Sequence, residues 1–176
     1  MGTVAAAGQT IVDLYAGVGY YTLPFLVHAG ATFVHACEWN PNSILSLKDN
    51  LRSNGVDSSR YAIHEGDNKN SVDKVRGVAD RVCLGLLPSS VTGWPLAVAA
   101  VKTSGGIIHV HENVVKKEIN PWVRDACKEF ERLFKEQIGV SMQVLCTHVE
   151  IVKSYAPRIV HIVADLKCTP FVGAVA

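Results

Sequence analysis

The sequence predicts an α/β fold: a mostly parallel, seven-stranded sheet covered by helices and ending in an antiparallel hairpin. Three observations support this prediction. Short β-branched runs alternate with helix-like segments, a Gly-x-Gly turn joins the first strand to the first helix, and two long alternating segments close the chain. With 176 residues, 48% of them hydrophobic, the chain has the length and composition of one domain with a substantial core.

The first predicted unit is a strand over residues 10–14, a turn containing Gly17 and Gly19, and a helix over residues 21–29. Glycine has no Cβ, so these two positions can adopt positive φ and let a ligand approach the backbone closely. The start of the helix also leaves free N–H groups that can meet a carboxylate. This strand, turn and helix are typical of nucleotide-binding α/β domains.

The remaining elements continue the alternation. We expect strands over residues 32–37, 61–65, 81–86 and 107–111, and helices over residues 43–54, 96–102 and 118–138. The two segments at 142–152 and 158–168 alternate in polarity around a Tyr-Ala-Pro corner, which predicts a hairpin at the edge of the sheet.

Acidic or polar residues stand at the ends of the first three predicted strands. Asp13 precedes the glycine turn, Glu38 follows the second strand, and Asp67 with Asn68 follows the third. Because ligands of open α/β sheets gather at the carboxyl ends of the strands, we expect these residues to surround a ligand. Glu38 can accept hydrogen bonds from both ribose hydroxyls and Asp67 from an adenine amino group, which favours S-adenosylmethionine (SAM). In the alternative, these are plain turns with solvated acids.

Two common phosphate-binding motifs do not match this sequence. A dinucleotide fingerprint needs a third glycine where this chain has Thr22, and no Gly-Lys-Ser/Thr sequence is present, which excludes a P-loop. His109 and His111 lie two residues apart on one strand face, but no third ligand is placed by the sequence. We therefore expect no metal, with His109 packed in the core and His111 at the strand end near the site.

Composition narrows the possible partners. The five cysteines are odd in number and form no Cys-x-x-Cys, which indicates reduced thiols in a cytoplasmic protein. No apolar run reaches about 18 residues, so we expect no membrane partner. The formal net charge is +1, so an RNA substrate would have to be held by a local basic patch or by other parts of the protein.

Four segments together resemble SAM-dependent enzymes that modify position 37 of tRNA. They are the glycine-turn segment 13–24, the segment 37–41, Gly66-Asp67-Asn68 and the corner 154–158. Two branches of that group compete: the guanine-N1 methyltransferases, and the second enzyme of wybutosine synthesis, which transfers the 3-amino-3-carboxypropyl (acp) group of SAM to the tricyclic base of tRNA-Phe. The methyltransferases carry an Asn-Leu-Pro element after the fourth strand. Here that place reads Leu87-Pro88-Ser89-Ser90, which favours the acp-transferase branch.

The resemblance implies a Rossmann-like class I SAM-methyltransferase fold and an enzyme acting on the anticodon loop of tRNA-Phe. It implies SAM-binding residues Asp13, Tyr15, Gly17, Gly19, Glu38, Trp39, Asp67, Asn68 and Leu86, and substrate-binding residues Pro88, Ser89 and Tyr155. We expect residues 1–9 to be a flexible start or an expression remnant and residues 10–170 to form the SAM-binding catalytic domain, without the upstream RNA-binding region of that group.

Two further functions remain open from the sequence. One is an ordinary SAM methyltransferase. The other is a catalytically silent SAM-fold module, although the intact Asp13 and Glu38 do not favour it. No residue is identified as a general base, and Tyr20, Trp39, Trp94 and Tyr155 are the candidates for stacking on an RNA base.

Overall fold

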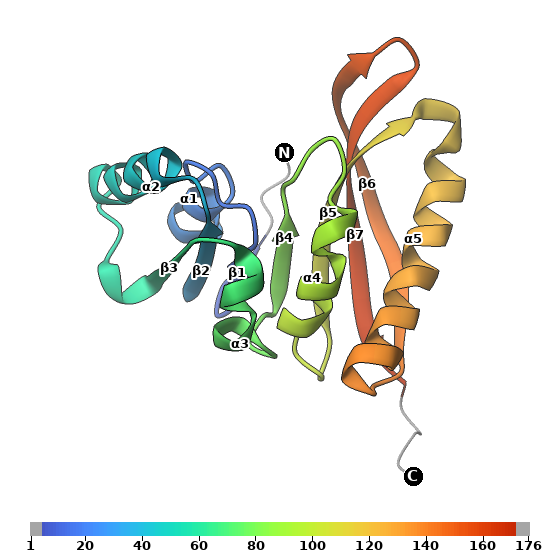
Figure 1. The fold of residues 1–176 in the computed structure, drawn as a ribbon, viewed down its shortest axis with the longest axis horizontal. Coiled ribbons are helices and arrows are strands. Elements are labelled where there is room, and N and C mark those ends of the chain that lie inside the picture. Colours follow the sequence, from blue (N-terminus) through green and yellow to red (C-terminus); the bar gives the residue numbers. More distant parts are fainter. Residues whose placement is uncertain (1–4, 172–176) are drawn as a thin grey trace.

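A computed structural model describes residues 5–171 and shows one seven-stranded sheet in the order β3-β2-β1-β4-β5-β7-β6 (Figure 1). The first five strands along the chain are parallel, and β7 inserts antiparallel between β5 and β6. The expected mostly parallel sheet with a carboxyl-terminal antiparallel hairpin is therefore confirmed. The strands are β1 (Thr10–Asp13), β2 (Phe33–Glu38), β3 (Tyr61–Glu65), β4 (Arg81–Leu84), β5 (Gly106–Val115), β6 (Met142–Ala156) and β7 (Ile159–Pro170).

Helices cover the two faces of the sheet in separate sets. They are α1 (Thr22–Val27), α2 (Pro41–Ser53), α3 (Val72–Val75), α4 (Trp94–Ala100) and α5 (Ile119–Leu133), with a π-helical turn over Phe134–Ile138. Leu26 of α1 and Leu47 of α2 share one core with Ile11, whereas Phe130 of α5 packs in the other core with Val12. Adjacent residues of β1 thus face opposite layers, as the alternation of a strand requires.

Two strands differ from the sequence expectation in ways that shape the site. β4 ends at Leu84, so Gly85 and Leu86 leave the sheet two residues early. β5 continues to Val115, because each residue from Glu112 onward pairs with β7. The polar residues His-Glu-Asn gave no sign of this extension in the sequence. The end of β5 is decided by its pairing with the distant strand β7 and not by the local pattern.

Residues 5–9 pack against the domain. Ala6 is fully buried and its N–H donates to the Ala29 carbonyl at 2.9 Å, while Arg81 Nε donates to Gln9 Oε1 at 2.6 Å. These contacts join residues 5–9, part of the segment expected as a flexible start or an expression remnant, to the end of α1 and to β4. Residues 1–4 of that expected segment lie outside the described residues.

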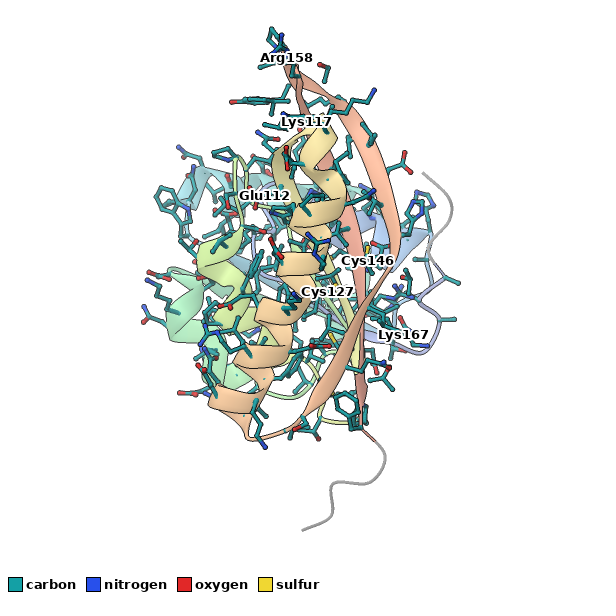
Figure 2. All side chains as sticks on the ribbon, turned by 90° about the vertical axis from the view of Figure 1, so that its right-hand side faces the viewer. Glu112, Lys117, Cys127, Cys146, Arg158 and Lys167 are labelled. Carbon is teal, nitrogen blue, oxygen red and sulfur yellow. The ribbon has the colours of Figure 1, made fainter. Side chains whose placement is uncertain are left out.

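The β6–β7 hairpin is long and projects past the body of the sheet (Figures 1 and 2). Its strands pair from Met142↔Pro170 to Ala156↔Ile159, with three register shifts along the way. At the turn, Arg158 adopts a left-handed φ of 66°. In the part of the chain that the structure describes, no helix is long and apolar enough to span a membrane.

Candidate active site

A pocket of about 830 Å³ opens at the carboxyl ends of the parallel strands, within the usual size range for a small-molecule site. It gathers side chains from the segments that follow β1, β2, β3 and β4. The lining residues are Leu14, Tyr15, Cys37, Glu38, Trp39, Gly66, Asp67, Asn68, Lys69, Gly85, Leu86 and Thr92. A second hollow, of about 550 Å³, lies between α2 and the outer strand β3 and takes no residue from the ends of β1, β2 or β4.

Glu38, the last residue of β2, organises the polar side of the pocket. Its Oε2 accepts the Gly17 N–H at 2.7 Å, and its Oε1 accepts the N–H groups of Trp39 at 3.0 Å and Asn40 at 2.8 Å. The residue is only 9% exposed, and it still lines the pocket. Three backbone donors hold the carboxylate in place, which leaves its remaining lone pairs available to a ligand.

The two glycines of the turn have different tasks. Gly17 has φ of 56°, and a Cβ added there would meet no atom within 4 Å, so the backbone is open on that side. At Gly19 an added Cβ would lie 3.0 Å from Cδ1 of both Leu23 and Leu47, so this glycine allows α1 and α2 to pack together. Neither glycine lines the pocket, and Gly19 contributes packing to the site.

Asp13 lies behind the pocket and not in it. The residue is fully buried; its Oδ2 accepts the Thr22 hydroxyl at 2.8 Å, and its Oδ1 accepts the Tyr15 N–H at 3.4 Å. Burial raises the pKa of this carboxyl to about 6, despite the hydrogen bond from Thr22. Asp13 therefore ties the end of β1 to the first turn of α1, and Thr22, where a dinucleotide motif would have glycine, is its partner.

The turn after β3 places its polar pair as the sequence suggests. Asn68 Nδ2 donates to the Leu14 carbonyl at 3.0 Å, which joins this turn to the end of β1. Asp67 Oδ1 accepts the Lys69 N–H at 2.9 Å and starts a short 3₁₀ turn. One oxygen of Asp67 is thus used by the turn, while the residue as a whole lines the pocket.

The wall below the pocket depends on close packing around Tyr15. A Cβ added to Gly93 would lie 2.5 Å from Tyr15 Oη, so only glycine leaves room for the phenol at that point. Leu86 and Thr92, before and after the loop that follows β4, complete this wall. On the opposite rim Trp39 is 70% exposed, and its indole is free to cover a planar ligand.

The loop after β4 is fastened to the end of β5. Ser89 Oγ donates to Glu112 Oε2 at 2.9 Å, and the Asn113 N–H donates to the Pro88 carbonyl at 2.9 Å. The Leu87–Pro88 peptide bond is cis. Burial raises the pKa of Glu112. Pro88 and Ser89, the expected substrate-binding residues, thus lie beside the pocket without lining it.

A buried polar cluster follows on β5 and β7. His111 Nδ1 lies 3.4 Å from Tyr21 Oη and 3.1 Å from His161 Nε2. Burial, aided by the neighbouring His161, lowers the pKa of His111 to about 4, so its ring is neutral at pH 7. In residues 5–171, the buried side-chain atoms without a hydrogen-bond partner are both polar atoms of the Asn113 amide and Nδ1 of His161, its register partner.

His109 is a packed residue with a carboxylate partner. It is 6% exposed, and its Nδ1 lies 2.7 Å from Asp165 Oδ1 on β7. Within the described chain no group of three His, Cys, Asp or Glu side chains is arranged to hold a metal. The five cysteines are all free, and burial raises the pKa of Cys37, at the pocket, to about 12. The Cys37 thiol is therefore protonated at pH 7 and is not a nucleophile.

The structure divides the expected site residues into three groups. The first group lines the pocket and consists of Tyr15, Glu38, Trp39, Asp67, Asn68 and Leu86. The second group supports the pocket from behind and consists of Asp13, Gly17 and Gly19. The third group lies beyond the pocket and consists of Pro88, Ser89 and Tyr155. Sequence reasoning missed Lys69, Thr92 and Glu112. Lys69 directly follows the Asp-Asn pair and could have been found, whereas Glu112 required the pairing of β5 with the loop after β4.

The residues present fit the adenosine part of SAM. The pocket offers one anchored carboxylate at the end of β2, a second acid after β3, an open glycine backbone at Gly66 and an exposed indole, around a volume sufficient for a nucleoside. These are groups that accept hydroxyl and amino protons and cover a purine, whereas a triphosphate would need a basic cradle that this pocket lacks apart from Lys69.

Comparison with known proteins points to one group. The chain is 42% identical over 194 residues to the tRNA wybutosine-synthesizing protein 2 homolog of Danio rerio, and 47% identical over 168 residues to the tRNA wybutosine-synthesizing protein 2/3/4 of Arabidopsis thaliana. These matches cover 93% and 96% of this chain, but 47% and 16% of the relatives. The chain thus spans about half the length, or less, of the curated relatives it matches.

Solved structures give the same result. Pyrococcus horikoshii TYW2 in complex with MeSAdo has a TM-score of 0.80 and 30% identity, covering 94% of this chain and 59% of that one. Methanocaldococcus jannaschii TYW2 in complex with AdoMet has a TM-score of 0.79 and 26% identity, covering 96% and 72%. The sequence matches the family described as the TRM5/TYW2 methyltransferase domain over residues 1–145, and the chain therefore belongs to that family.

Proposed function

We propose that this domain binds SAM in the pocket at the ends of β1–β4 and transfers its acp group to the base at position 37 of tRNA-Phe. The observation that carries the proposal is the anchored Glu38 carboxylate in a nucleoside-sized pocket, within a chain at about 40% identity to wybutosine-synthesizing proteins. Methylthioadenosine, the MeSAdo bound by the P. horikoshii relative, is what remains of SAM after its acp group has left.

Each pocket residue takes a defined part in this proposal. Glu38 accepts the ribose hydroxyls while three backbone N–H groups fix its carboxylate. Asp67 accepts the adenine amino group, and Trp39 covers the purine. Leu86 and Tyr15 form the apolar floor toward the sulfur end. Asp13 acts indirectly, because it holds the turn through Thr22 and Tyr15.

Orientation decides which group moves. SAM supplies a sulfonium with three electrophilic carbons, and the carbon in line with the acceptor and the departing sulfur is the one attacked. The residues at the sulfur end therefore select the product by fixing the cofactor's rotation, and positioning of this kind contributes effective molarities of about 10⁵ M or more. The sequence Leu87-Pro88-Ser89-Ser90 lies next to that end, and its anchoring to Glu112 and Asn113 makes it a fixed wall.

The spent cofactor tests the proposal. Full-length protein containing this domain is incubated with SAM and, in separate reactions, with tRNA-Phe that carries the tricyclic precursor base and with tRNA-Phe that carries unmodified guanine at position 37, and the products are separated by chromatography. Acp transfer yields methylthioadenosine together with a tRNA heavier by one acp group. S-adenosylhomocysteine in step with tRNA methylation would instead support the guanine-N1 methyltransferase, and no turnover with intact SAM binding would support a non-catalytic module.

The proposal also includes the part of the tRNA that is bound and the location of the protein in the cell. The anticodon loop is the part of the tRNA that we expect to reach the pocket, since position 37 lies there and single-stranded bases can be turned out toward a protein. The free cysteines are compatible with a cytoplasmic location, where thiols remain reduced.

A further inference from the structure

Four cations gather where the β6–β7 hairpin turns beside the end of β5. They are Lys116, Lys117, Lys153 and Arg158, and we call them the cationic tip. Residues 113–117 and 152–160, which form this end of the three strands, contain no Asp or Glu. The whole chain has a formal net charge of only +1. The residues outside the tip therefore include three more Asp and Glu than Lys and Arg. The tip thus carries a formal charge of +4, while the rest of the chain carries a formal net charge of −3.

Backbone pairing holds the tip together. Val115 pairs with Ile159, Ser154 pairs with Val160, and the Lys116 N–H donates to the Arg158 carbonyl at 2.8 Å. Segments far apart in the chain thus present their cations from one small piece of sheet. Figure 2 shows Lys117 and Arg158 together at the end of the hairpin, at the opposite end of the strands from Lys167.

The charges of the tip are available to a partner. All four side chains belong to exposed residues. Lys117 approaches Glu118 only to 3.8 Å, with 83% of its own side chain exposed, and the other three form no ion pair with any residue of the described chain. Cations elsewhere, such as Arg132 and Lys48, are already paired with carboxylates. An anion would therefore meet unneutralised charge at the tip and not on those other surfaces.

The tip stands on the same edge of the sheet as the pocket. Glu112, which fastens the loop after β4 through Ser89, lies on β5 four residues before Lys116, which directly follows the last residue of that strand. At the rise of a β-strand, this separation corresponds to about 13 Å. Figure 1 shows the hairpin rising past the ends of β4 and β5, and residues that follow β4 line the pocket at this edge of the sheet.

An exposed aromatic residue accompanies the cations. Tyr155 is 60% exposed, and Val152 on the same strand is 39% exposed. Surfaces that bind single-stranded nucleic acid combine cations along the backbone with aromatic rings on which bases stack. A surface for an acidic protein would not need the ring, so the combination favours RNA.

We propose that the cationic tip is the docking surface for the phosphate backbone of the RNA strand on one side of the target base. The inference rests on the proposed function in that the RNA is the tRNA substrate, and it goes further by assigning the contact to residues outside the pocket. The phosphates lie against Lys116, Lys117, Lys153 and Arg158, which leaves the base itself free to turn toward the loop after β4.

Salt dependence of RNA binding is the direct test. The 176-residue chain is titrated with a fluorescein-labelled RNA hairpin bearing the anticodon loop of tRNA-Phe, between about 50 and 200 mM KCl. For the triple variant Lys116→Gln, Lys117→Gln, Arg158→Gln we expect affinity to fall about tenfold at the lowest salt. The slope of log K against log salt should become shallower by about two to three, since each lost phosphate contact removes about 0.7 to 1.

A matched variant carries the same change of charge at sites away from the tip. Lys128→Gln, Lys135→Gln, Lys167→Gln replaces three exposed lysines that form no ion pair within residues 5–171, and its salt slope should stay within about 0.5 of the unmodified chain. Equal losses in the two triple variants, an unchanged slope in the tip variant, or no salt-sensitive RNA binding at all would overturn the proposal. Binding to anionic phosphatidylserine vesicles in place of RNA would overturn it as well.

The outcome is separable from that of the proposed function. Calorimetric binding of SAM should be the same in the tip variant and the unmodified chain, because the tip residues do not line the pocket. If RNA binding responds as expected but the spent cofactor is S-adenosylhomocysteine, the docking surface stands and the acp-transferase assignment fails. If methylthioadenosine forms while the tip variant binds RNA normally, only the docking surface fails.

Discussion

Polar side chains are buried at the carboxyl ends of β1 and β2 and also at the neighbouring ends of β5 and β7. The two regions differ in how these side chains are hydrogen-bonded. At β1 and β2, Asp13 and Glu38 together accept five hydrogen bonds from nearby backbone and hydroxyl donors. At β5 and β7, the Asn113 amide and one nitrogen of His161 are buried with no hydrogen-bond partner among residues 5–171. The first region is organised before any ligand arrives, whereas the second retains unused donors and acceptors.

The difference in hydrogen bonding indicates which of the two regions is already arranged to bind a cofactor. A satisfied carboxylate holds its geometry and needs no rearrangement to bind, which suits a cofactor pocket. An unsatisfied buried amide costs about 1–3 kcal/mol, and proteins keep such groups where another constraint requires them. Four substitutions would break or sharpen this comparison.

The largest effect is expected at Glu38. Glu38→Ala leaves three backbone N–H groups without their acceptor, so the free energy of unfolding should fall by about 3 kcal/mol, and SAM should bind about 1.5–3 kcal/mol more weakly. Urea denaturation and calorimetry measure the two quantities. Glu65→Ala is the matched control, because Glu65 pairs in register with Glu38 but forms only an exposed ion pair with Lys48, worth less than about 1 kcal/mol. Equal losses would contradict the assigned role of Glu38.

The two regions should respond to pH with opposite signs. Asp13 has a folded pKa of about 6, above its ordinary value, so the folded state holds its proton more tightly and stability falls as pH rises from about 4 to 6. His111 has a folded pKa of about 4, below its ordinary value, so its contribution to stability is lost as pH falls from about 6.5 to 4. Each contribution is of the order of 3 kcal/mol.

In the unmodified chain these contributions oppose each other over the same pH range. Asp13→Asn removes the first, so the variant should gain stability steadily from about pH 4 to 6.5, where the unmodified chain changes little. Denaturation midpoints at three pH values in this range measure the difference. Parallel pH profiles for the two proteins would show that Asp13 titrates normally.

A smaller effect, of opposite direction, is expected at Asn113. Asn113→Leu replaces an unpartnered buried amide by an apolar group of similar size, so the free energy of unfolding should rise by about 1 kcal/mol. Asn50→Leu is the control in the other region, since Asn50 Nδ2 donates to the Val18 carbonyl at 2.9 Å and its loss should cost about 1 kcal/mol. Destabilisation by both substitutions would mean that Asn113 has a partner in solution.

The smallest effect is expected at Tyr21, which connects the two regions. Its hydroxyl lies 3.4 Å from His111 Nδ1, beyond the range of a strong hydrogen bond, and burial raises the pKa of this phenol to about 12. Tyr21→Phe should therefore change the free energy of unfolding by less than about 0.5 kcal/mol. A loss above 1.5 kcal/mol, measured in the same urea titrations, would show that the contact is a full hydrogen bond.

The sequence was sufficient for the order of the strands and the longer helices, but it indicated a loop where the short helix α3 lies, and it was sufficient for the residues at the ends of the first three strands. Glu38, Asp67 and Asn68 reach the pocket because parallel strands bring their carboxyl ends to one edge, which is a property of the topology and not of detailed packing. The antiparallel hairpin also lies at the edge of the sheet as expected, whereas its pairing through β7, with β6 outermost, was not indicated by the sequence.

What the sequence did not reveal depends on contacts between distant residues. Asp13 resembles a ligand-binding acid until the position of Thr22 shows that its oxygens are used internally. Gly19 resembles an open turn glycine, but the approach of Leu47 from α2 decides its role. The pairing of Asn113 with His161 requires the register of β5 on β7, and a shift of one residue would reverse the face of every side chain.

The contact of Gly93 with Tyr15 couples two positions that are far apart in the sequence. Because a Cβ at position 93 would lie 2.5 Å from the phenol oxygen of Tyr15 and 2.9 Å from Cδ2 of Leu84, a larger residue there requires these side chains to move or to be replaced by smaller ones. Among relatives of this chain, glycine at the first position should therefore accompany a tyrosine at the second, and larger residues at the first should accompany smaller ones at the second. Substitutions at positions 15 and 93 therefore depend on each other, and the order in which they occur determines which sequences natural selection can reach.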